Sequence, residues 1–454
     1  MTEPKRITDH GIAAELLDAN AINVVNTLKE NGYEAYLVGG CVRDLLCNQA
    51  PKDFDVATSA TPEEVKELFR RARLVGRRFP IAHVRFGRDV IEVSTFRQGQ
   101  LEHVETNDQG LIVKDLAFGT LEEDAFRRDF TINALYYDVD SNEIIDYVGG
   151  LADIEAELVR LIGEVPERLA EDPVRLLRAM RFAAKLDFKL QEELLDYVDE
   201  TADRLEAIPG ARLFDEFLKM FLAGYGAPVW DLLRDTPLVH SLFPSCNPDN
   251  PLIGAAMANT DQRISADQPV TPGFLVAVLL WDDFAARYMR DNPKHKPNVT
   301  FELAMDTLAI QQQHIAIPRR FSIFAREVWQ LQHRLEERHP RNINHLLGHK
   351  RFRAAFDFLT LRAESDPALA KQATWWHEIQ EASDSEQAKM IGELGKPGTK
   401  RRRRRRRRNN KPNSGNSQSG NAQPRKLNPG EISHASSTFP SDFARSYSPD
   451  NNEY

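Results

Sequence analysis

The hydrophobic pattern of the chain changes at Gly149-Gly150, and this change constrains the fold more than any other feature. Upstream, short apolar segments such as Tyr36-Leu37-Val38 are separated by turn residues and amphipathic stretches. Downstream, apolar residues recur at the helical spacing, as in Leu176-Leu177-xx-Met180-xx-Ala183. The sequence therefore predicts an α+β unit that ends near residue 150, followed by helices alone.

The α+β unit is expected to alternate short strands and short helices. Thr61-Pro62-Glu63-Glu64 marks a helix start, because it supplies an N-cap, a proline at the first helical position and a glutamate at N3. Strands are expected at 36–38, 54–57, 83–86, 90–96, 131–138 and 143–147, helices at 42–46, 62–70 and 121–127, and a loop at 97–117. These segments predict a small mixed β-sheet with flanking helices.

Composition and periodicity divide the chain into successive segments. Residues 1–31 are expected to form a mostly helical lead-in, 32–160 the α+β head, 161–225 a helical neck and 226–395 an all-helical body. From 396 to 454 Gly, Pro, Ser, Asn and Arg dominate, so a hydrophobic core cannot form there. This last segment is predicted to be a disordered basic tail.

Charge is distributed unevenly along the chain. Residues 400–454 carry 13 Lys and Arg against 4 Asp and Glu, whereas residues 1–399 carry 46 against 64. A basic tail on an acidic body indicates that contact with a polyanion is concentrated in the tail. The alternative is that the tail is only a solvated extension.

Several protein classes are disfavoured by simple counts. The longest apolar run, Phe274–Trp281, is too short to span a bilayer, and the N-terminus lacks the apolar core of a secretory signal. The three cysteines, Cys41, Cys47 and Cys246, form no CxxC pair and argue against a zinc site. We therefore expect a cytoplasmic protein without a transmembrane segment.

The first group of candidate site residues joins a glycine turn to a pair of aspartates. Gly39-Gly40 lies between an expected strand and an expected helix that carries Arg43, where backbone N–H groups can approach a triphosphate. Asp53 and Asp55 are spaced by two, so on a strand both carboxylates face the same side. Such a pair can share two Mg²⁺ ions, about 3.5–4 Å apart in two-metal phosphoryl-transfer sites. Each element alone is commonly structural, but together they indicate nucleotidyl transfer with Asp53 and Asp55 as metal ligands.

A second group, Arg127-Arg128-Asp129, precedes the expected strand at 131–138. The arginines can reach phosphate, and Asp129 can serve as a third metal-site carboxylate or as a partner that orients an arginine. Glu92 competes for the third-carboxylate role, since it lies in the apolar segment 90–93, where an unpaired carboxylate would be costly. Taken alone, the segment favours an ordinary surface ion pair before a buried strand.

A third group is the stretch Glu171–Arg175, followed by Arg178 and Arg181. Asp172 is a favourable N-cap and Pro173 a favourable first helical residue, so helix initiation explains part of the pattern. Capping does not explain three arginines spaced by three beside apolar positions. They are expected to form a basic strip on a helix whose other face is buried, which suits binding of a nucleotide phosphate or base.

In this order and spacing, GGCVRD…DFD, RRDFTINA and EDPVRLLRAMRFAA resemble the bacterial tRNA nucleotidyltransferase/poly(A) polymerase family. With their connections they cover about residues 30–225. The resemblance implies a nucleotidyltransferase head followed by a helical neck and an RNA-binding body. It implies that Asp53 and Asp55 hold the catalytic metals and that Asp129 is a third active-site acid. It further implies nucleotide contacts for Gly40, Arg43, Arg128, Arg178 and Arg181, and reading of the base edge by Asp172 and Arg175.

The implied base-reading pair does not by itself choose the nucleotide. A carboxylate accepts from an exocyclic amino group, and a guanidinium donates to the neighbouring ring nitrogen. Adenine and cytosine both present that edge, whereas guanine and uracil do not. Asp172 with Arg175 therefore fits ATP and CTP alike.

Three features favour poly(A) addition over CCA addition. Residues 74–84, LVGRRFPIAHV, are similar to a signature of bacterial poly(A) polymerases. The sequence has no His-Asp doublet, so the metal-dependent phosphohydrolase domain of some CCA-adding enzymes is not expected. Arg401–Arg408 resembles the basic tails of poly(A) polymerases, which meet many RNAs with little sequence preference. The expected activity is template-independent addition of AMP from ATP to RNA 3′ ends, with release of pyrophosphate.

Two other interpretations are open. One is a CCA-adding tRNA nucleotidyltransferase, which would incorporate CTP. The other is a non-catalytic RNA-binding or RNA-chaperone protein with the same fold, which the presence of Asp53, Asp55, Arg43 and Arg128 disfavours. The tail is also the expected place for protein partners in RNA decay.

Overall fold

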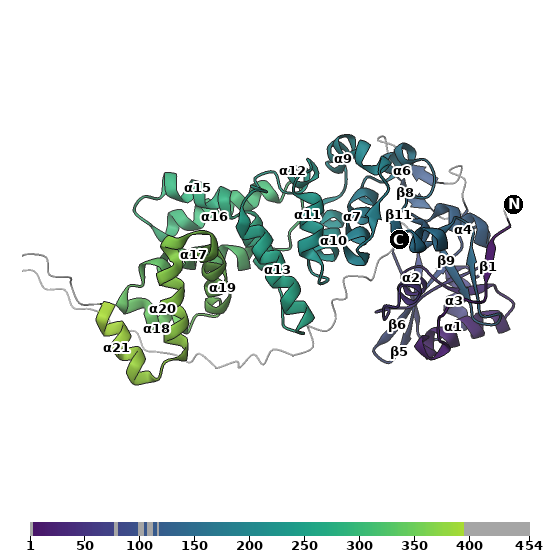
Figure 1. Cartoon of the computed structure of the whole chain (residues 1–454), viewed down its shortest axis with the longest axis horizontal. Helices are drawn as coiled ribbons and strands as arrows, with labels where there is room; N and C mark the ends of the chain where they lie inside the picture. Colours follow the sequence, from purple (N-terminus) through teal and green to yellow (C-terminus); the bar gives the residue numbers. More distant parts are fainter. Residues whose placement is uncertain (1–2, 77–79, 99–103, 107–111, 116–117, 395–454) are drawn as a thin grey trace, which may run out of the picture.

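The computed structural model describes residues 3–76, 80–98, 104–106, 112–115 and 118–394. The molecule is elongated, with a head that contains the β-sheet at one end and helices alone at the other (Figure 1). Among the described residues, no helix is long and apolar enough to cross a membrane. The predicted α+β head followed by a helical neck and body is confirmed.

Within the described part of the chain, the head is built on a mixed sheet of eight strands. Their order is β1-β10-β9-β2-β3-β6-β5-β4, and every neighbouring pair is antiparallel except β3 and β6, which are parallel. The strands are β1 (Lys5–Ile7), β2 (Ala35–Val38), β3 (Asp55–Thr58), β4 (Ala72–Val75), β5 (Ile81–Phe86), β6 (Asp89–Thr95), β9 (Leu135–Asp138) and β10 (Glu143–Asp146).

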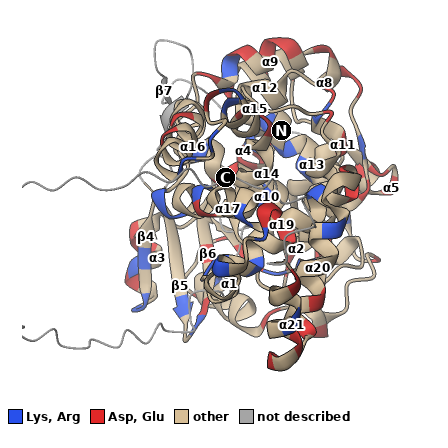
Figure 2. Cartoon of the chain, turned by 90° about the vertical axis from the view of Figure 1, so that its left-hand side faces the viewer, with Lys and Arg blue, Asp and Glu red and all other residues tan. Residues whose placement is uncertain are grey.

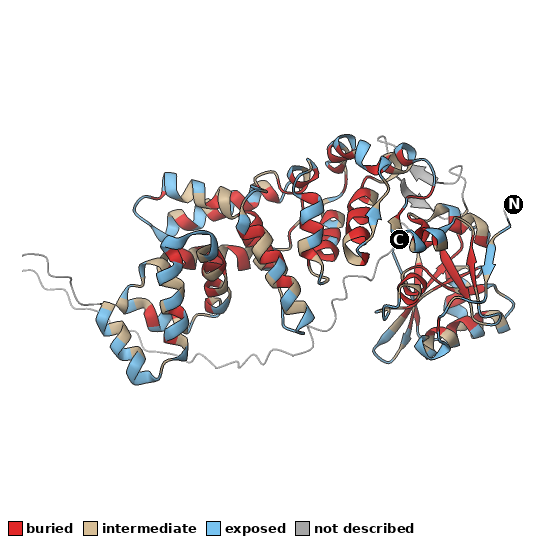
Figure 3. Ribbon diagram, viewed as in Figure 1, coloured by how far each residue is buried: buried red, intermediate tan, exposed pale blue. Residues whose placement is uncertain are grey.

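Alternation along the strands sends side chains into separate cores on the two faces of this sheet. Leu37 and Val56 are buried on one face with α1 (Ala19–Glu30) and α3 (Pro62–Leu68). The residues that follow them in each strand, Val38 and Ala57, are buried on the other face with α4 (Leu121–Arg127). The head also contains α2 (Gly40–Leu46) and α5 (Gly150–Glu155). Figure 3 shows that much of the ribbon of the head strands is coloured as buried.

Several head segments differ from the sequence-based expectation. The lead-in contains the helix α1 as expected, but its residues 5–7 form the edge strand β1 and pair with β10. The expected loop at 97–117 contains a two-stranded antiparallel pair, β7 (Val104–Thr106) and β8 (Ile112–Asp115). The expected strand at 131–138 begins as a 3-10 helix, Thr131–Asn133, and β4 was not anticipated. These strands have only three or four residues, so periodicity carries little signal for them.

The neck and body are helical apart from a two-stranded parallel pair, β11 (Leu158–Val159) and β12 (Lys189–Leu190). One continuous set of buried side chains runs from Phe130 in the head to Ile379 in the body, so the neck and body share a hydrophobic core. The neck helices are α6 (Val165–Glu171), α7 (Val174–Leu186), α8 (Glu193–Asp196), α9 (Val198–Leu205) and α10 (Gly210–Phe221). The body helices are α11 (Gly226–Leu233), α12 (Leu238–Leu242), α13 (Pro251–Ser265), α14 (Pro272–Leu279), α15 (Trp281–Asp291), α16 (Pro297–Gln311), α17 (Arg319–Glu337), α18 (Ile343–Leu347), α19 (Phe352–Ser365), α20 (Ala370–Glu381) and α21 (Asp384–Leu394).

A buried ion pair joins two of the neck helices. Arg181 of α7 is 0% exposed, and its Nε donates to Oε1 of Glu216 on α10 at 2.9 Å. Burial would raise the pKa of Glu216, but Arg181 and the nearby Lys219 hold that pKa below the usual carboxyl range. Because the pKa is lowered by folding, the pair stabilises the protein at neutral pH, and this stability is lost as the pH falls through the folded pKa.

We expect Glu216→Ala to lower the free energy of unfolding by about 3–5 kcal/mol, because the Arg181 guanidinium would stay buried without this carboxylate. Urea denaturation at pH 7 measures the loss, and the difference from the wild type should shrink as the pH falls below 5. Glu206→Ala, at an exposed position just after α9, is the control and should change stability by about 0.5 kcal/mol or less. A loss below about 1 kcal/mol for Glu216→Ala would show that the pair contributes little.

Candidate functional site

A pocket lies where β2 turns into α2 and β3 begins. Gly39 occupies the turn with φ +76° and ψ −129°, a conformation that L side chains rarely adopt. A Cβ there would lie 3.6 Å from Nη1 of Arg128, an ordinary van der Waals distance, so the positive φ and not crowding is what favours glycine, and Arg128 lies beside the turn. The pocket is lined by Gly40, Cys41, Arg43, Asp44, Lys52, Asp53, Asp55 and Lys185.

The two predicted metal ligands meet in this pocket. Asp53 lies two residues before β3 and Asp55 is the first residue of that strand, while Phe54 and Val56 between and after them are buried in the head core. This alternation turns both carboxylates toward the pocket, and both are half-buried. Carboxylate oxygens are the hard donors that Mg²⁺ prefers, so the pair fits the ion chemically. Among the described residues, no three His, Cys, Asp or Glu side chains are grouped closely enough to form a metal site by themselves.

Glu92 lies beside this pair. It is the residue of β6 in register with Asp55 on the parallel strand β3, so both side chains are on the same face of the sheet. Glu92 is 6% exposed, and its Oε1 is 3.2 Å from Nε2 of His83 on β5. A row of three neighbouring strands therefore places Asp55, Glu92 and His83 side by side.

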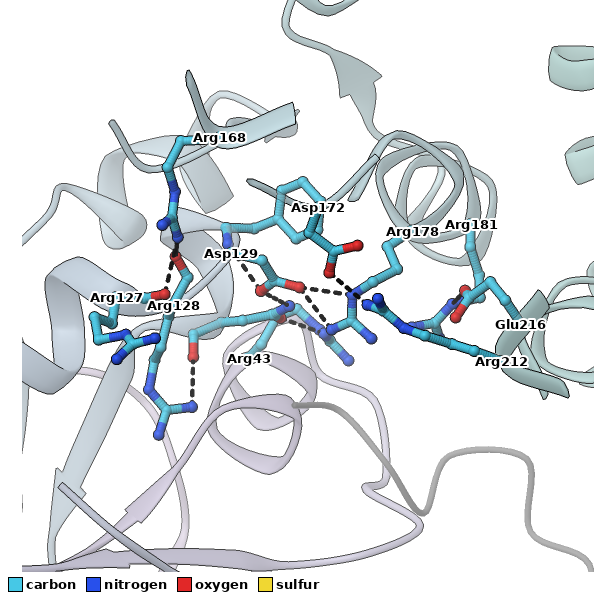
Figure 4. Close-up of polar contacts among 12 residues, drawn as sticks. Arg43, Arg127, Arg128, Asp129, Arg168, Asp172, Arg178, Arg181, Arg212 and Glu216 are labelled. Carbon is cyan, nitrogen blue, oxygen red and sulfur yellow. Dashed lines mark hydrogen bonds and ion pairs between the residues drawn. The ribbon is translucent and has the colours of Figure 1, made fainter. Parts of the chain in front are cut away.

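Asp129 is hydrogen-bonded to Arg178, to the backbone of Phe130 and to Asn133. Its Oδ2 accepts from Nε of Arg178 at 2.8 Å and lies 2.6 Å from Nη2 of the same guanidinium. Its Oδ1 accepts from the Phe130 backbone N–H at 2.8 Å and from Nδ2 of Asn133 at 3.4 Å. Burial would raise the pKa of Asp129, but Arg178 holds that pKa below the usual range. Figure 4 shows the Asp129 carboxylate pointing toward Arg178, and neither Asp129 nor Glu92 is among the residues that line the pocket.

Arg43 lies at the centre of the interface between α2 and α7. It is 0% exposed, and its Nε and Nη2 donate to Oδ1 of Asp44 at 2.9 and 2.7 Å. Its Nη1 donates to Oδ1 of Asn133 at 2.5 Å, and its guanidinium lies over the Phe182 ring at 4.9 Å. Oδ2 of Asp44 accepts from Lys185 of α7 at 3.1 Å. Burial would raise the pKa of Asp44, but the Arg43 and Lys185 charges lower it below the usual value.

Arg128 is fixed beside the glycine turn. Its Nε and Nη2 donate to Oδ2 of Asp124 at 3.2 and 3.0 Å, and its Nε donates to the Tyr136 hydroxyl at 3.0 Å. Arg168 of α6 then ties this part of the head to the neck, because its Nη2 donates to the backbone carbonyls of Arg127 and Arg128 at 2.8 Å each. Burial and the neighbouring Arg175 charge lower the pKa of Arg168 to about 10.

The arginines of α7 do not form the exposed basic strip that the sequence predicts. Arg178 is 7% exposed beside Asp129, and Arg181 is 0% exposed beside Glu216. Arg175 donates to Oε2 of Glu171 at 2.8 Å. The expectation fails because the acidic partners of Arg178 and Arg181 come from other elements, which a helical wheel of α7 cannot show.

The two residues expected to read the base edge, Asp172 and Arg175, also contact other protein groups. The predicted N-cap role of Asp172 is wrong, because α7 begins at Val174 and Pro173 occupies the N-cap position, but Asp172 Oδ1 still accepts from the backbone N–H of Val174 at 3.2 Å. Its Oδ2 pairs with Arg212 of α10 (Figure 4). Arg175 and Asp172 thus both contact protein groups in this conformation.

Sequence reasoning missed several residues that complete the site. They are Asp44, Lys52, Asn133, Arg168, Lys185 and Arg212. Asp44 and Asn133 stand inside the quoted motifs, so their place in the motif was an available signal. Arg168, Lys185 and Arg212 gain their places only through the packing of the neck on the head and of α10 on α7.

Three family models match the chain. The Poly A polymerase head domain matches residues 35–160, the probable RNA and SrmB-binding site of polymerase A matches 187–249, and the polymerase A arginine-rich C-terminus matches 294–410. Solved structures share the fold at low identity. The Thermotoga maritima CCA-adding enzyme complexed with tRNA has a TM-score of 0.57 and 20% identity, covering 87% of this chain and 93% of that one. The Bacillus stearothermophilus CCA-adding enzyme in complex with CTP has a TM-score of 0.51 and 24% identity, covering 84% and 88%.

The sequence relatives are of two kinds, poly(A) polymerases and CCA-adding enzymes, and they differ in how much of this chain they match. Poly(A) polymerase I of Escherichia coli is 44% identical over 405 residues, which cover 85% of this chain and 87% of that protein. Poly(A) polymerase I of Haemophilus influenzae is 40% identical, covering 82% and 87%. The CCA-adding enzyme of Lactobacillus johnsonii is 39% identical over only 219 residues, or 48% of this chain and 54% of that enzyme. Because likeness to the poly(A) polymerases extends through the head, the neck and most of the body, the chain belongs to the bacterial poly(A) polymerase family.

Proposed function

We propose that this protein is a template-independent polynucleotide adenylyltransferase that transfers AMP from ATP to the 3′-hydroxyl of RNA and releases pyrophosphate. The observation that carries the proposal is the pocket in which Asp53 and Asp55 face Gly40 and Arg43. The extended likeness to poly(A) polymerases supports adenylate as the product. Because ATP and RNA ends are intracellular, we assign the activity to the cytoplasm.

Asp53 and Asp55 are the residues that would hold Mg²⁺. When bound, the two ions would activate the attacking 3′-hydroxyl and neutralise charge on the departing pyrophosphate. The protein's own contribution is to hold both carboxylates on the same side of the chain. The burial of Phe54 and Val56 on the opposite side enforces this arrangement.

Glu92 is the better candidate for a third acid at the metal site. Its register with Asp55 supports this role, whereas the contacts of Asp129 with Arg178 and Asn133 support an orienting role for Asp129. In that role Asp129 fixes the guanidinium of Arg178 and the amide of Asn133. The amide oxygen of Asn133 in turn accepts a hydrogen bond from Arg43.

Gly39, Gly40, Arg43 and Arg128 are proposed to bind the nucleotide phosphates, because they border the pocket or the turn beside it. Asp172 and Arg175 are proposed to read the base edge. Their present partners, Arg212 and Glu171, must then share or release them when ATP binds. Arg178 and Arg181 are likewise proposed to act on the nucleotide.

RNA 3′ ends are the proposed second substrate, with contacts spread over the body and the tail and with little sequence preference. Protein partners in RNA decay are proposed to act through the tail. The folded part offers limited attraction for RNA by itself, because residues 1–399 have an excess of acidic side chains. Figure 2 shows some of them along the outer faces of α9 and α21.

We expect Asp53→Ala, Asp55→Ala and Glu92→Ala each to reduce AMP addition by roughly a thousandfold or more, as follows from removing several kcal/mol of charge stabilisation. Primer extension at saturating Mg²⁺ and ATP measures the loss. Asp53→Ala and Asp55→Ala remove no core volume, so their thermal unfolding should match the wild type.

Asp129→Asn separates the two candidates for the third acid. It keeps the shape of the side chain but weakens the contact with Arg178, so we expect mainly a higher KM for ATP. Exposed Asp89 on β6 provides the control, Asp89→Ala, which should extend RNA normally. A Glu92→Ala variant as active as the wild type, beside an inactive Asp129→Asn, would assign the third acid to Asp129.

Incubation of an RNA primer with each nucleoside triphosphate separately tests the product. We expect a homopolymer of A, little incorporation of C, and essentially none of G or U, because only adenine and cytosine present the amino edge that Asp172 and Arg175 can read. The products are sized by gel electrophoresis. A discrete CCA addition to a tRNA that lacks its 3′ end, made when CTP and ATP are supplied together, would favour the CCA-adding alternative.

Removal of residues 396–454, which lie outside the described residues, is expected to weaken RNA binding and shorten processive extension while leaving the chemical step nearly unchanged. If roughly half of Arg401–Arg408 engages RNA, the log–log salt dependence of binding should flatten by about 3, from a slope of about −0.7 per neutralised phosphate on single strands. The melting temperature should not move, because this segment has too little apolar content to add to the core. Equal salt slopes for the full-length and truncated proteins would mean that the arginines serve another partner.

A further inference from the structure

The neck contributes a cation to the pocket of the head. Lys185 is on α7, yet its side chain lines the same pocket as Gly40, Asp53 and Asp55. Its Nζ lies 3.1 Å from Oδ2 of Asp44 on α2, and its side chain is 17% exposed. Helix α7 is therefore close enough to place a charge within the site where the proposed reaction occurs.

Lys185 is able to bind a second anion. An ammonium group has three N–H donors, and the contact with Asp44 uses one of them. Asp44 is itself shared, because its other oxygen accepts from Arg43. The shared carboxylate thus holds both cations at the pocket without neutralising two positive charges.

The charges around the pocket favour the triphosphate over the RNA backbone as that anion. Lys185 shares the pocket with Gly40 and Arg43, which are proposed to meet the nucleotide phosphates, and with Asp53 and Asp55, which are proposed to hold the metals. Those acids would repel an approaching RNA phosphate, whereas a triphosphate would arrive with its charge shared by the metal ions. A cation beside the departing phosphates is stabilising where their negative charge develops.

We propose that Lys185 binds the part of the ATP triphosphate that leaves as pyrophosphate, so that the nucleotide pocket of the head is complete only when the neck helix α7 is docked on it. This inference rests on the proposed function, because it assigns a further substrate contact to the same site. It gives the ion pair between Lys185 and Asp44 a role beyond joining head and neck.

Equilibrium binding to the full-length protein tests the proposal without turnover. The ligands are ATP with Mg²⁺ in the absence of RNA, inorganic pyrophosphate with Mg²⁺, and a single-stranded RNA without nucleotide. The variant is Lys185→Met, which keeps the aliphatic stem and removes the charge. We expect the Kd values for ATP and pyrophosphate to rise roughly ten- to hundredfold, which is the range for losing a charge-assisted hydrogen bond. The Kd for RNA should change by about twofold or less, which is well below the loss expected when a charge-assisted hydrogen bond to the ligand is removed.

Two further variants separate binding from structure. Lys185→Arg retains the charge and should recover most of the pyrophosphate affinity, although its planar donor group fits a site built for an ammonium less well. Lys189→Met removes a nearby exposed lysine that follows α7 and should bind all three ligands like the wild type. Melting temperatures of all variants are measured in parallel.

Unchanged ATP and pyrophosphate affinity in Lys185→Met would overturn the proposal, and so would an equal loss of RNA affinity. A lower melting temperature that Lys185→Arg restores, without recovery of pyrophosphate binding, would also overturn it, because the ion pair would then be structural alone. RNA extension by the wild-type protein is followed in the same preparation. Failure of that extension counts against the proposed function. The ratio of the Kd values of the wild type and Lys185→Met tests only the role of Lys185.

Discussion

The arrangement of the site depends on one ring of charged and amide groups between the head and α7. It runs from Lys185 through Asp44, Arg43, Asn133 and Asp129 to Arg178, so that α7 supplies both ends two helical turns apart. The Phe182 ring lies between these ends, with the guanidiniums of Arg43, Arg178 and Arg181 all within 4.3–5.5 Å of its centroid. Buried charges are tolerable only when each is paired and hydrogen-bonded, so every member of the ring constrains its neighbours.

Asn133 shows how the ring fixes geometry. Its amide oxygen accepts a hydrogen bond from Arg43 and its amide nitrogen donates one to Asp129. The charges on either side therefore determine the orientation of the amide. A glutamine or an aspartate at this position would change the length or the charge of the connection. The ring therefore explains why Asn133 stands in the same motif as Arg128 and Asp129, a feature that helix and strand patterns leave unexplained.

The sequence predicts those parts of the site that depend on local chemistry. The strand alternation at Asp53 and Asp55 and the glycine turn at Gly39 follow from backbone preference and burial, and the structure places Asp53, Asp55 and Gly40 around one pocket. The order of an α+β head before helices follows equally from the change in periodicity at Gly149. The contacts of Arg178 with Asp129, of Arg181 with Glu216 and of Lys185 with Asp44 join residues 35 to 141 positions apart, and no local pattern encodes them. Sequence spacing alone therefore suggested an exposed basic strip where the structure has buried ion pairs.

The same long-range contacts separate two tasks within α7. Arg178 pairs with Asp129 of the head and Arg181 pairs with Glu216 of α10, so these contacts join α7 to both elements. Lys185, one turn beyond Arg181, is the α7 cation that lines the pocket among the described residues. Because α7 contacts the head and α10 through Arg178 and Arg181 and reaches the pocket through Lys185, it links the position of the neck to the shape of the nucleotide pocket. Motion of the neck relative to the head would then move Lys185 within the nucleotide pocket, whereas Asp53 and Asp55 belong to the segment of the head that leads into β3.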